Sequence, residues 1–328
     1  MLAYIIRRIL YAFPILLGVN LLLFALFFYV STPDDMAEQI LGEKRVTPEQ
    51  IENWKREHGY HFPKWYNADE ERLAARFTQT LFWQKMVPSF YFHFGKSDMD
   101  NSSIGRTMLG RIPYSLYLTV PVFLAAIMIG LFLAMIVAFY RATYVDVWAL
   151  VICVTMMSIS TLFYIIGGQY IFAIKLKLVP VSGFDEAVPY CFKFLVLPVA
   201  IAVIASIGGN VRYYRTIFLE EINKDYIRTA RAKGLGEGAV LFKHALKNAM
   251  IPILTNVVVS IPFLITGSLL LENFFGIPGL GNYTIKAITD QDFAVIRAMV
   301  YLGSVLYVVA LVCVDISYTF VDPRVRLE

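Results

Sequence analysis

The side chains of this sequence that could carry out chemistry are few and stand far apart. No nucleophile accompanies its four histidines, which all fall outside the long apolar runs: His58, His61, His93 and His244. His58 and His61 could share a helix face, but Gly59 lies between them and no third ligand is near, which argues against a zinc site. Since no convergent catalytic set is visible, we predict neither a catalytic residue nor a metal site.

A phosphate-binding loop is not expected either. The turn Gly95-Lys96-Ser97 resembles the end of such a loop, but the motif needs a glycine five residues before its second glycine, and Phe90 occupies that position. We therefore predict that the chain binds no cofactor and hydrolyses no nucleotide.

The composition places the chain in a membrane. It is 58% apolar and only 16% charged, and its mean hydropathy is +0.61, which is typical of an integral membrane protein. The odd number of cysteines (Cys153, Cys191 and Cys313) provides no disulfide framework. The surroundings that we expect are membrane lipid and other proteins, with no nucleic acid.

Six apolar runs are each long enough to cross a bilayer core, which takes about 20 residues. They cover residues 9–30, 114–139, 147–174, 192–211, 250–271 and 294–320. The first resembles a signal peptide, but its apolar core is too long and no small-residue cleavage site follows, so we interpret it as an uncleaved span. The sequence thus predicts an all-α polytopic membrane protein with an N-terminal helix (1–30), an extracytoplasmic region (31–112), a five-helix core (113–321) and a cytoplasmic tail (322–328).

The orientation follows from the basic residues. Arg7 and Arg8 precede the first span, and the loop 212–248 is rich in Lys and Arg. Because basic residues concentrate in short cytoplasmic segments, we expect this loop and both chain ends in the cytoplasm.

The region 31–112 then lies outside and should fold as a small structured unit. Thr47 and Gln50 fit a helix-capping pattern, Pro48 suits the first helical position, and Pro63 is predicted to end the helix.

The loop 212–248 keeps a helical rhythm although it is polar. Ile222, Tyr226, Ala230 and Gly234 fall on one face at helical spacing. The small Ala230 and Gly234 would let a partner surface approach closely, and Tyr226 and Leu235 could fill pockets beside them. The basic residues of this stretch, Arg228, Arg231 and Lys233, would pair with an acidic rim or with anionic lipid. The residues alone leave two readings open, a protein-docking helix and an interfacial lipid-binding helix.

The charged residues nearest to the span interiors are Glu272 and Asp315. Such residues are either structural anchors or members of an ion relay. Since Arg324 or Arg212 could pair with Asp315, we favour an anchor there. Glycines within the spans, such as Gly208 and Gly209, permit close approach between helices.

The loop 212–248 resembles the EAA loop of ABC-importer permeases, in the form found in the dipeptide/oligopeptide family. The general motif places an acidic residue and two alanines six, five and four positions before a glycine; here only Ala230 and Gly234 keep that pattern. The peptide-permease version departs in the same way. Further similar stretches are the opening 4–8, the segments 47–51, 58–60 and 94–97, the stretch 267–281, and the C-terminal 315–318 and 322–326.

This resemblance implies the type I importer permease fold and the B-type subunit, which carries a loop after its first span. The implied partners are a homologous second permease subunit in a heterodimer, two cytoplasmic P-loop ATPase subunits that bind ATP and Mg, and an extracytoplasmic solute-binding protein that delivers di- or oligopeptides. It implies a bacterial inner-membrane location. The implied ATPase-coupling residues are Asp225, Tyr226, Arg228, Thr229, Ala230, Arg231, Lys233, Gly234 and Leu235. The implied outer-loop or gate residues are Glu272, Phe274, Pro278, Gly279 and Gly281.

Two alternatives remain at this point. The same importer architecture serves nickel chelates, glutathione and other small solutes. An ion-coupled secondary transporter should show coupling-ion residues at mid-membrane or inverted repeats, and the sequence shows neither.

Overall fold

The apolar runs form helices because a bilayer offers no water to the backbone, so each N–H and C=O group must be satisfied within its own segment. The computed structural model describes residues 2–42, 46–185 and 190–321. Apart from one isolated bridge between Lys96 and Ser103, this described part contains no β-structure. The predicted all-α fold is therefore confirmed.

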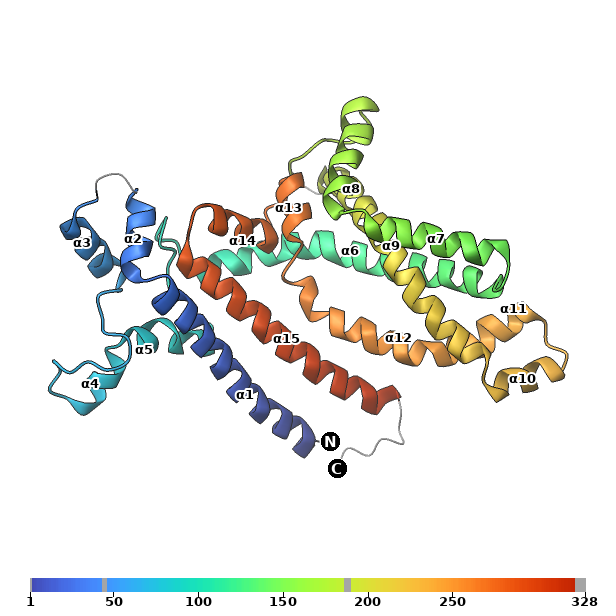
Figure 1. Ribbon diagram of the computed structural model, residues 1–328, viewed down its shortest axis with the longest axis horizontal. Coiled ribbons are helices and arrows are strands. Elements are labelled where there is room, and N and C mark those ends of the chain that lie inside the picture. Colours follow the sequence, from blue (N-terminus) through green and yellow to red (C-terminus); the bar gives the residue numbers. More distant parts are fainter. Residues whose placement is uncertain (1, 43–45, 186–189, 322–328) are drawn as a thin grey trace. The chain divides into compact units, whose positions relative to one another are not determined.

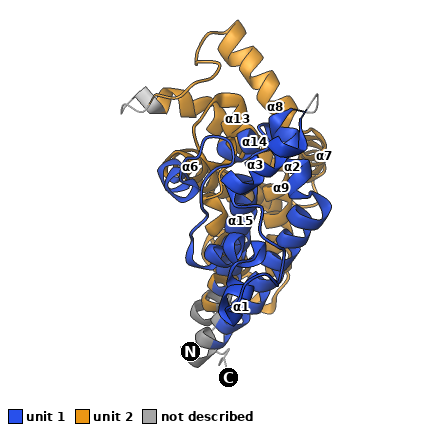
Figure 2. Cartoon of the chain, turned by 90° about the vertical axis from the view of Figure 1, so that its left-hand side faces the viewer, with its two compact units in different colours: residues 1–112, 283–312, 328 blue, residues 113–282, 313–327 orange. Residues whose placement is uncertain are grey.

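The described chain divides into two compact units, which Figure 2 colours separately. Unit 1 includes Met1–Ile112 and Tyr283–Val312, and unit 2 includes Pro113–Asn282. The elements up to the division at residue 112 are α1 (Leu2–Ala25), η1 (Leu26–Val30), α2 (Pro33–Leu41), α3 (Pro48–His58), α4 (Leu73–Thr78), α5 (Leu81–Lys85), η2 (Val87–Tyr91) and the first turns of α6 (Ile104–Phe139).

The elements that follow α6 in unit 2 are α7 (Tyr144–Ser158), α8 (Thr161–Gly168), η3 (Gln169–Lys175), α9 (Tyr190–Ile222), α10 (Asp225–Ala232), α11 (Glu237–Ala239), η4 (Val240–Ala245), α12 (Leu246–Ser260), η5 (Pro262–Leu264) and α13 (Leu269–Phe275). The last two elements are α14 (Leu280–Thr289) and α15 (Phe293–Val321). Figure 1 labels most of them along the chain.

Five helical segments in the described residues are long and apolar enough to cross a membrane: Leu10–Val30, Ile104–Phe139, Phe192–Ile222, Glu237–Leu264 and Phe293–Val314. A sixth is α7 followed by α8 and η3, two apolar helices that bend by 88° at a short break. The apolar run over 147–174 therefore forms a bent pair of helices and not one continuous helix. The break falls at Ile159 and Ser160, whose backbones are extended.

Two other span boundaries also differ from the prediction. The span expected to end at residue 211 continues as α9 to Ile222, because Tyr214, Phe218 and Ile222 are buried in the core of unit 2 and favour one more helical stretch. The span expected over 250–271 stops at Ser260, and after Pro262 and a positive-φ Gly267 the chain starts the separate helix α13.

Unit 1 encloses its own aromatic core. Phe24, Phe28 and Met36 are fully buried, and α2 and α3 pack there with α1 and α15. The ring of Phe27 lies 6.2 Å from that of Phe293, and Figure 1 shows α1 and α15 side by side. The segment 31–112 is thus folded together with two spans.

The capping prediction for α3 is confirmed, but its end point was wrong. Thr47 and Gln50 form the reciprocal capping box, with Pro48 in the first turn. The helix ends at His58, before Pro63, because Gly59 adopts φ +68 and terminates it in the left-handed conformation.

A polar network joins this region to the start of α15. The Tyr60 hydroxyl donates to the Asp98 carboxylate at 2.9 and 3.0 Å and accepts from Arg297 Nη2 at 2.9 Å. Asp98 also accepts from the N–H of Ala294, and Ser97 Oγ donates to Asp292 at 2.5 Å. No sequence pattern indicated this network, because its members lie up to 237 positions apart.

In unit 2, α7 and α9 approach each other closely at Gly208. A Cβ atom placed there would lie 2.6 Å from the carbonyl oxygen of Cys153 and 3.1 Å from Met157 Cγ, whereas one placed on Gly209 would meet nothing within 4 Å. The carbonyl belongs to a rigid helix, so it cannot move aside without displacing α7.

We expect Gly208→Ala to lower the free energy of unfolding by about 1–3 kcal/mol, the usual cost of overpacking. Gly209→Ala, on the same helix, should change it little. Thermal unfolding of the two purified variants in one detergent measures both effects. Equal melting temperatures for the two variants would contradict the close helix contact.

Candidate functional site

The predicted coupling helix exists as α10, and it is anchored to its own chain through one buried face. Ile227 is fully buried and Ala230 is 5% exposed, and both pack with Phe218, Val240 and Leu241 in the core of unit 2. Burying these side chains holds the short helix in place, because eight residues form no stable helix in isolation.

The expected docking role of Ala230 was therefore wrong. Ala230 faces the interior and offers no surface to a partner. Gly234 is exposed, but it lies beyond the end of α10, where φ is +79 and its N–H donates to the carbonyl of Arg231 at 2.9 Å. Its function in the fold is to reverse the chain in a conformation that L side chains rarely adopt.

The exposed surface of α10 and of the turn after it is mostly polar and basic, with Ala232 and Leu235 as its apolar side chains. Of the residues predicted for coupling, those that are exposed are Asp225, Arg228, Thr229, Lys233, Gly234 and Leu235. Leu235 is 40% exposed. An apolar side chain within a charged rim suits a protein surface with acidic groups around an apolar hollow.

Glu221, a residue that sequence reasoning missed, ties α10 to the end of α9. Its carboxylate is 8% exposed, accepts from the Tyr226 hydroxyl at 2.5 Å and also pairs with Lys224. Burial, followed by the hydrogen bond to Glu221, raises the pKa of Tyr226 to about 12, so this hydroxyl remains a donor at neutral pH. Tyr226 therefore anchors α10 instead of filling a pocket on a partner.

A second tie connects α10 to α11. Arg231 Nε and Nη2 donate to the two carboxylate oxygens of Glu237 at 2.6 and 3.1 Å. Such a bidentate pair fixes geometry as well as charge. These two interactions hold α10 to the end of α9 and to α11.

The predicted outer-loop residues converge on Glu272. This side chain is fully buried, and its oxygens accept from the N–H groups of Ser268 at 3.1 Å and of Asn282 at 3.0 Å. Burial raises the pKa of Glu272 above its usual range, against the opposing effect of these N–H donors.

Two of the predicted glycines allow the close packing around that carboxylate. A Cβ atom on Gly279 would lie 2.3 Å from Glu272 Oε2, and one on Gly281 would lie 2.7 Å from the backbone of Ser268. Gly267, before α13, is also needed, since a Cβ atom placed there would lie 1.9 Å from Glu272 Oε1. The turn between α13 and α14 can therefore close only over glycine.

Ser115 completes this cluster from a distant part of the sequence. Its fully buried Oγ accepts from the N–H of Leu280 at 2.8 Å. Of the other predicted loop residues, Phe274 is 36% exposed and its carbonyl accepts from Gln169, and Pro278 is half-buried. Glu272 acts as an internal anchor of the loop, and no sequence pattern indicated its partner Ser115.

The expectation for Asp315 cannot be carried further, because its side chain and the tail 322–328, with Arg324, lie outside the described residues.

Comparison with protein families finds two matches that together cover most of the chain. Residues 126–327 match the model described as "Binding-protein-dependent transport system inner membrane component". Residues 1–119 match the model of the N-terminal part of the same membrane component.

Similar proteins carry transport names. The dipeptide transport system permease protein DppB of Bacillus subtilis (strain 168) is 31% identical over 88% of each chain. DppB of Alkalihalophilus pseudofirmus is 29% identical over 99% of this chain and all of its own length. The glutathione transport system permease protein GsiC of Shigella flexneri is also 29% identical, over the full length of both chains.

The buried carboxylate can be tested with an isosteric change. We expect Glu272→Gln to destabilise the protein by about 1–3 kcal/mol, because its NH₂ group would face a backbone N–H and leave that donor unsatisfied. Asp290→Asn, an equivalent change at an exposed carboxylate just after α14, should be neutral. Unfolding temperatures in detergent measure the difference, and an unchanged value for Glu272→Gln would show that the carboxylate does not anchor the loop.

Proposed function

Since the chain belongs to the family of binding-protein-dependent transport system inner membrane components, we propose that it forms half of the translocation path of an ATP-driven importer for peptides. It is a multi-pass inner-membrane permease subunit of an ABC importer. The names of similar proteins support a peptide cargo, since two of them are dipeptide transport system permeases.

The complete transporter in this proposal contains a homologous second permease subunit, two cytoplasmic ATPase subunits that bind ATP and Mg, and an extracytoplasmic solute-binding protein. The chain itself supplies no nucleotide chemistry. Its N- and C-termini and α10 lie on the cytoplasmic side, in agreement with the basic residues of the loop 212–248.

The observation that supports the proposal is the way in which contacts within its own unit hold α10. One face of α10 is buried in its own unit, and Glu221 and Glu237 fix its two ends. The opposite face is exposed and mostly polar and basic. A helix held in this way transmits motion. Closure of an ATPase dimer against it would displace α9 and α12 and bias the spans between inward-open and outward-open states.

Replacing Gly234 should uncouple the transporter. We expect Gly234→Val to reduce uptake severalfold while ATP hydrolysis continues, because a β-branched residue at φ +79 is strained and would redirect the chain after α10. Gly236→Val is the matched control, since φ is −63 there and a Cβ meets nothing within 4 Å. Uptake and hydrolysis are measured in proteoliposomes that contain the whole complex. Normal uptake per ATP in the Gly234 variant would contradict the coupling role.

The cargo is tested by ATPase stimulation of the same reconstituted complex with its binding protein. We expect peptides of two to five residues to raise hydrolysis severalfold over the unliganded binding protein. Stimulation by glutathione alone would transfer the assignment to the cargo named for GsiC. If no peptide of any length stimulates hydrolysis, the peptide assignment fails and the importer architecture stands.

A further inference from the structure

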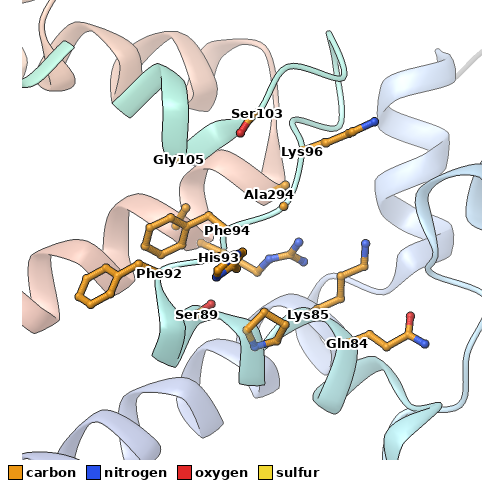
Figure 3. A pocket seen from close by; sticks show the side chains of 14 residues that line it. Gln84, Lys85, Ser89, Phe92, His93, Phe94, Lys96, Ser103, Gly105 and Ala294 are labelled. Carbon is orange, nitrogen blue, oxygen red and sulfur yellow. The ribbon is translucent and has the colours of Figure 1, made fainter. Parts of the chain in front are cut away.

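A basic cavity of about 410 Å³ lies within unit 1 and has no part in the coupling proposed above. Its walls come from α5, η2, the turn that follows η2, and the first turns of α6 and α15. Figure 3 shows the nitrogen atoms of Lys85 and Lys96 on one side of the cavity and the rings of Phe92 and Phe94 on the other. Arg297 lines it as a third cation.

The three cations have no carboxylate within 4.0 Å among the described residues. Arg297 donates from Nη2 to the Tyr60 hydroxyl, and its buried Nη1 has no hydrogen-bond partner. Lys85 donates to the carbonyl of His58 at 2.5 Å, and burial lowers the pKa of Lys85 to about 8. Lys96 is exposed at the rim.

The nearby carboxylates do not cancel this charge. Asp98 accepts hydrogen bonds from the Tyr60 hydroxyl and the N–H of Ala294, and Asp292 accepts one from Ser97 Oγ. Glu57, which is exposed, also lies near Lys85 and Lys96. None of these carboxylates forms an ion pair with the three cations in the described structure, and the buried Nη1 of Arg297 remains without a partner. In a partly dry cavity such an unpaired cationic group attracts a bound anion more strongly than it would in water.

The mouth of the cavity is aromatic and lies where two spans begin. An adjoining groove of about 760 Å³ is lined by Trp83 and Tyr91 and shares Gln84, Pro88 and His93 with the cavity. Trp83 is 47% exposed and Tyr91 is 74% exposed. Exposed Trp and Tyr at the ends of apolar spans are characteristic of the headgroup level of a bilayer.

We propose that this cavity binds the headgroup of an anionic phospholipid, with the phosphate held by Lys85, Lys96 and Arg297 and the acyl chains lying along the groove beside Trp83 and Tyr91. The unpaired Nη1 of Arg297 and the two lysines favour an anion, and the aromatic groove at the membrane interface favours an amphipathic one. A bound lipid would thereby brace the segment 31–112 against the spans of its own unit.

Fluorescence of Trp83 provides the test. The full-length chain in mixed micelles is titrated with acyl-brominated phosphatidylglycerol or phosphatidylcholine, whose bromine atoms quench tryptophan fluorescence. The contribution of Trp83 is the difference between the fluorescence of the unchanged chain and that of the Trp83→Phe variant. We expect half-quenching at a severalfold lower mole fraction of the anionic lipid. Lys96→Ala and Lys85→Met should each weaken that preference by about fivefold, in line with the usual contribution of one basic residue near an anionic headgroup.

Arg72→Ala is the matched control, since it removes an exposed cation of the same unit away from the cavity, and it should leave the preference intact. The Lys96 side chain is exposed and makes no hydrogen bond within the described residues, so Lys96→Ala should fold normally. It therefore tests the proposal even if Lys85→Met does not fold. Equal quenching by the two lipids, or an unchanged preference in Lys96→Ala, would overturn the proposal. Loss of the preference on adding millimolar inorganic phosphate would also overturn it, because the cavity would then be a site for free anions.

Discussion

The structure of this protein depends on the absence of water around its spans. Backbone groups in a bilayer must find partners within the chain, so each interruption of a helix needs a substitute donor or acceptor. Around α13 the substitutes are the Glu272 carboxylate and Ser115 Oγ, which accept from the N–H groups of Ser268 before α13 and of Leu280 and Asn282 in the first turn of α14. Gly267 and Gly279 are required there because a Cβ atom on either would collide with the carboxylate.

Helix α10 depends on its own unit for its stability. It is too short to persist alone, so its apolar face is buried against α9 and η4 and its ends are fixed by carboxylates. What remains exposed is a polar, basic surface that makes no contribution to the core. A coupling helix needs a buried face that holds it in place and an exposed face that is available to a partner.

Much of this could be predicted from the sequence. The presence of apolar helices, the capping box at Thr47 and Gln50, and the position of α10 depend on neighbouring residues, and all are found in the structure. The errors came from tertiary contacts. Burial of Tyr214 and Phe218 extended α9 past the apolar run, an extended pair at Ile159 and Ser160 broke a uniformly apolar span, and Ala230 turned inward although its small size suggested a docking surface.

The sequence by itself determined the membrane class, the helical fold and the family, because hydropathy and local motifs are properties of contiguous residues. Only the tertiary structure decided which side chains meet. Glu221 with Tyr226, Ser115 with Leu280, and Tyr60 with Arg297 are pairs whose partners are set by packing in space. The basic cavity is the clearest case, since its cations come from three separate segments of the chain and acquire a common function only when the fold places them around one space.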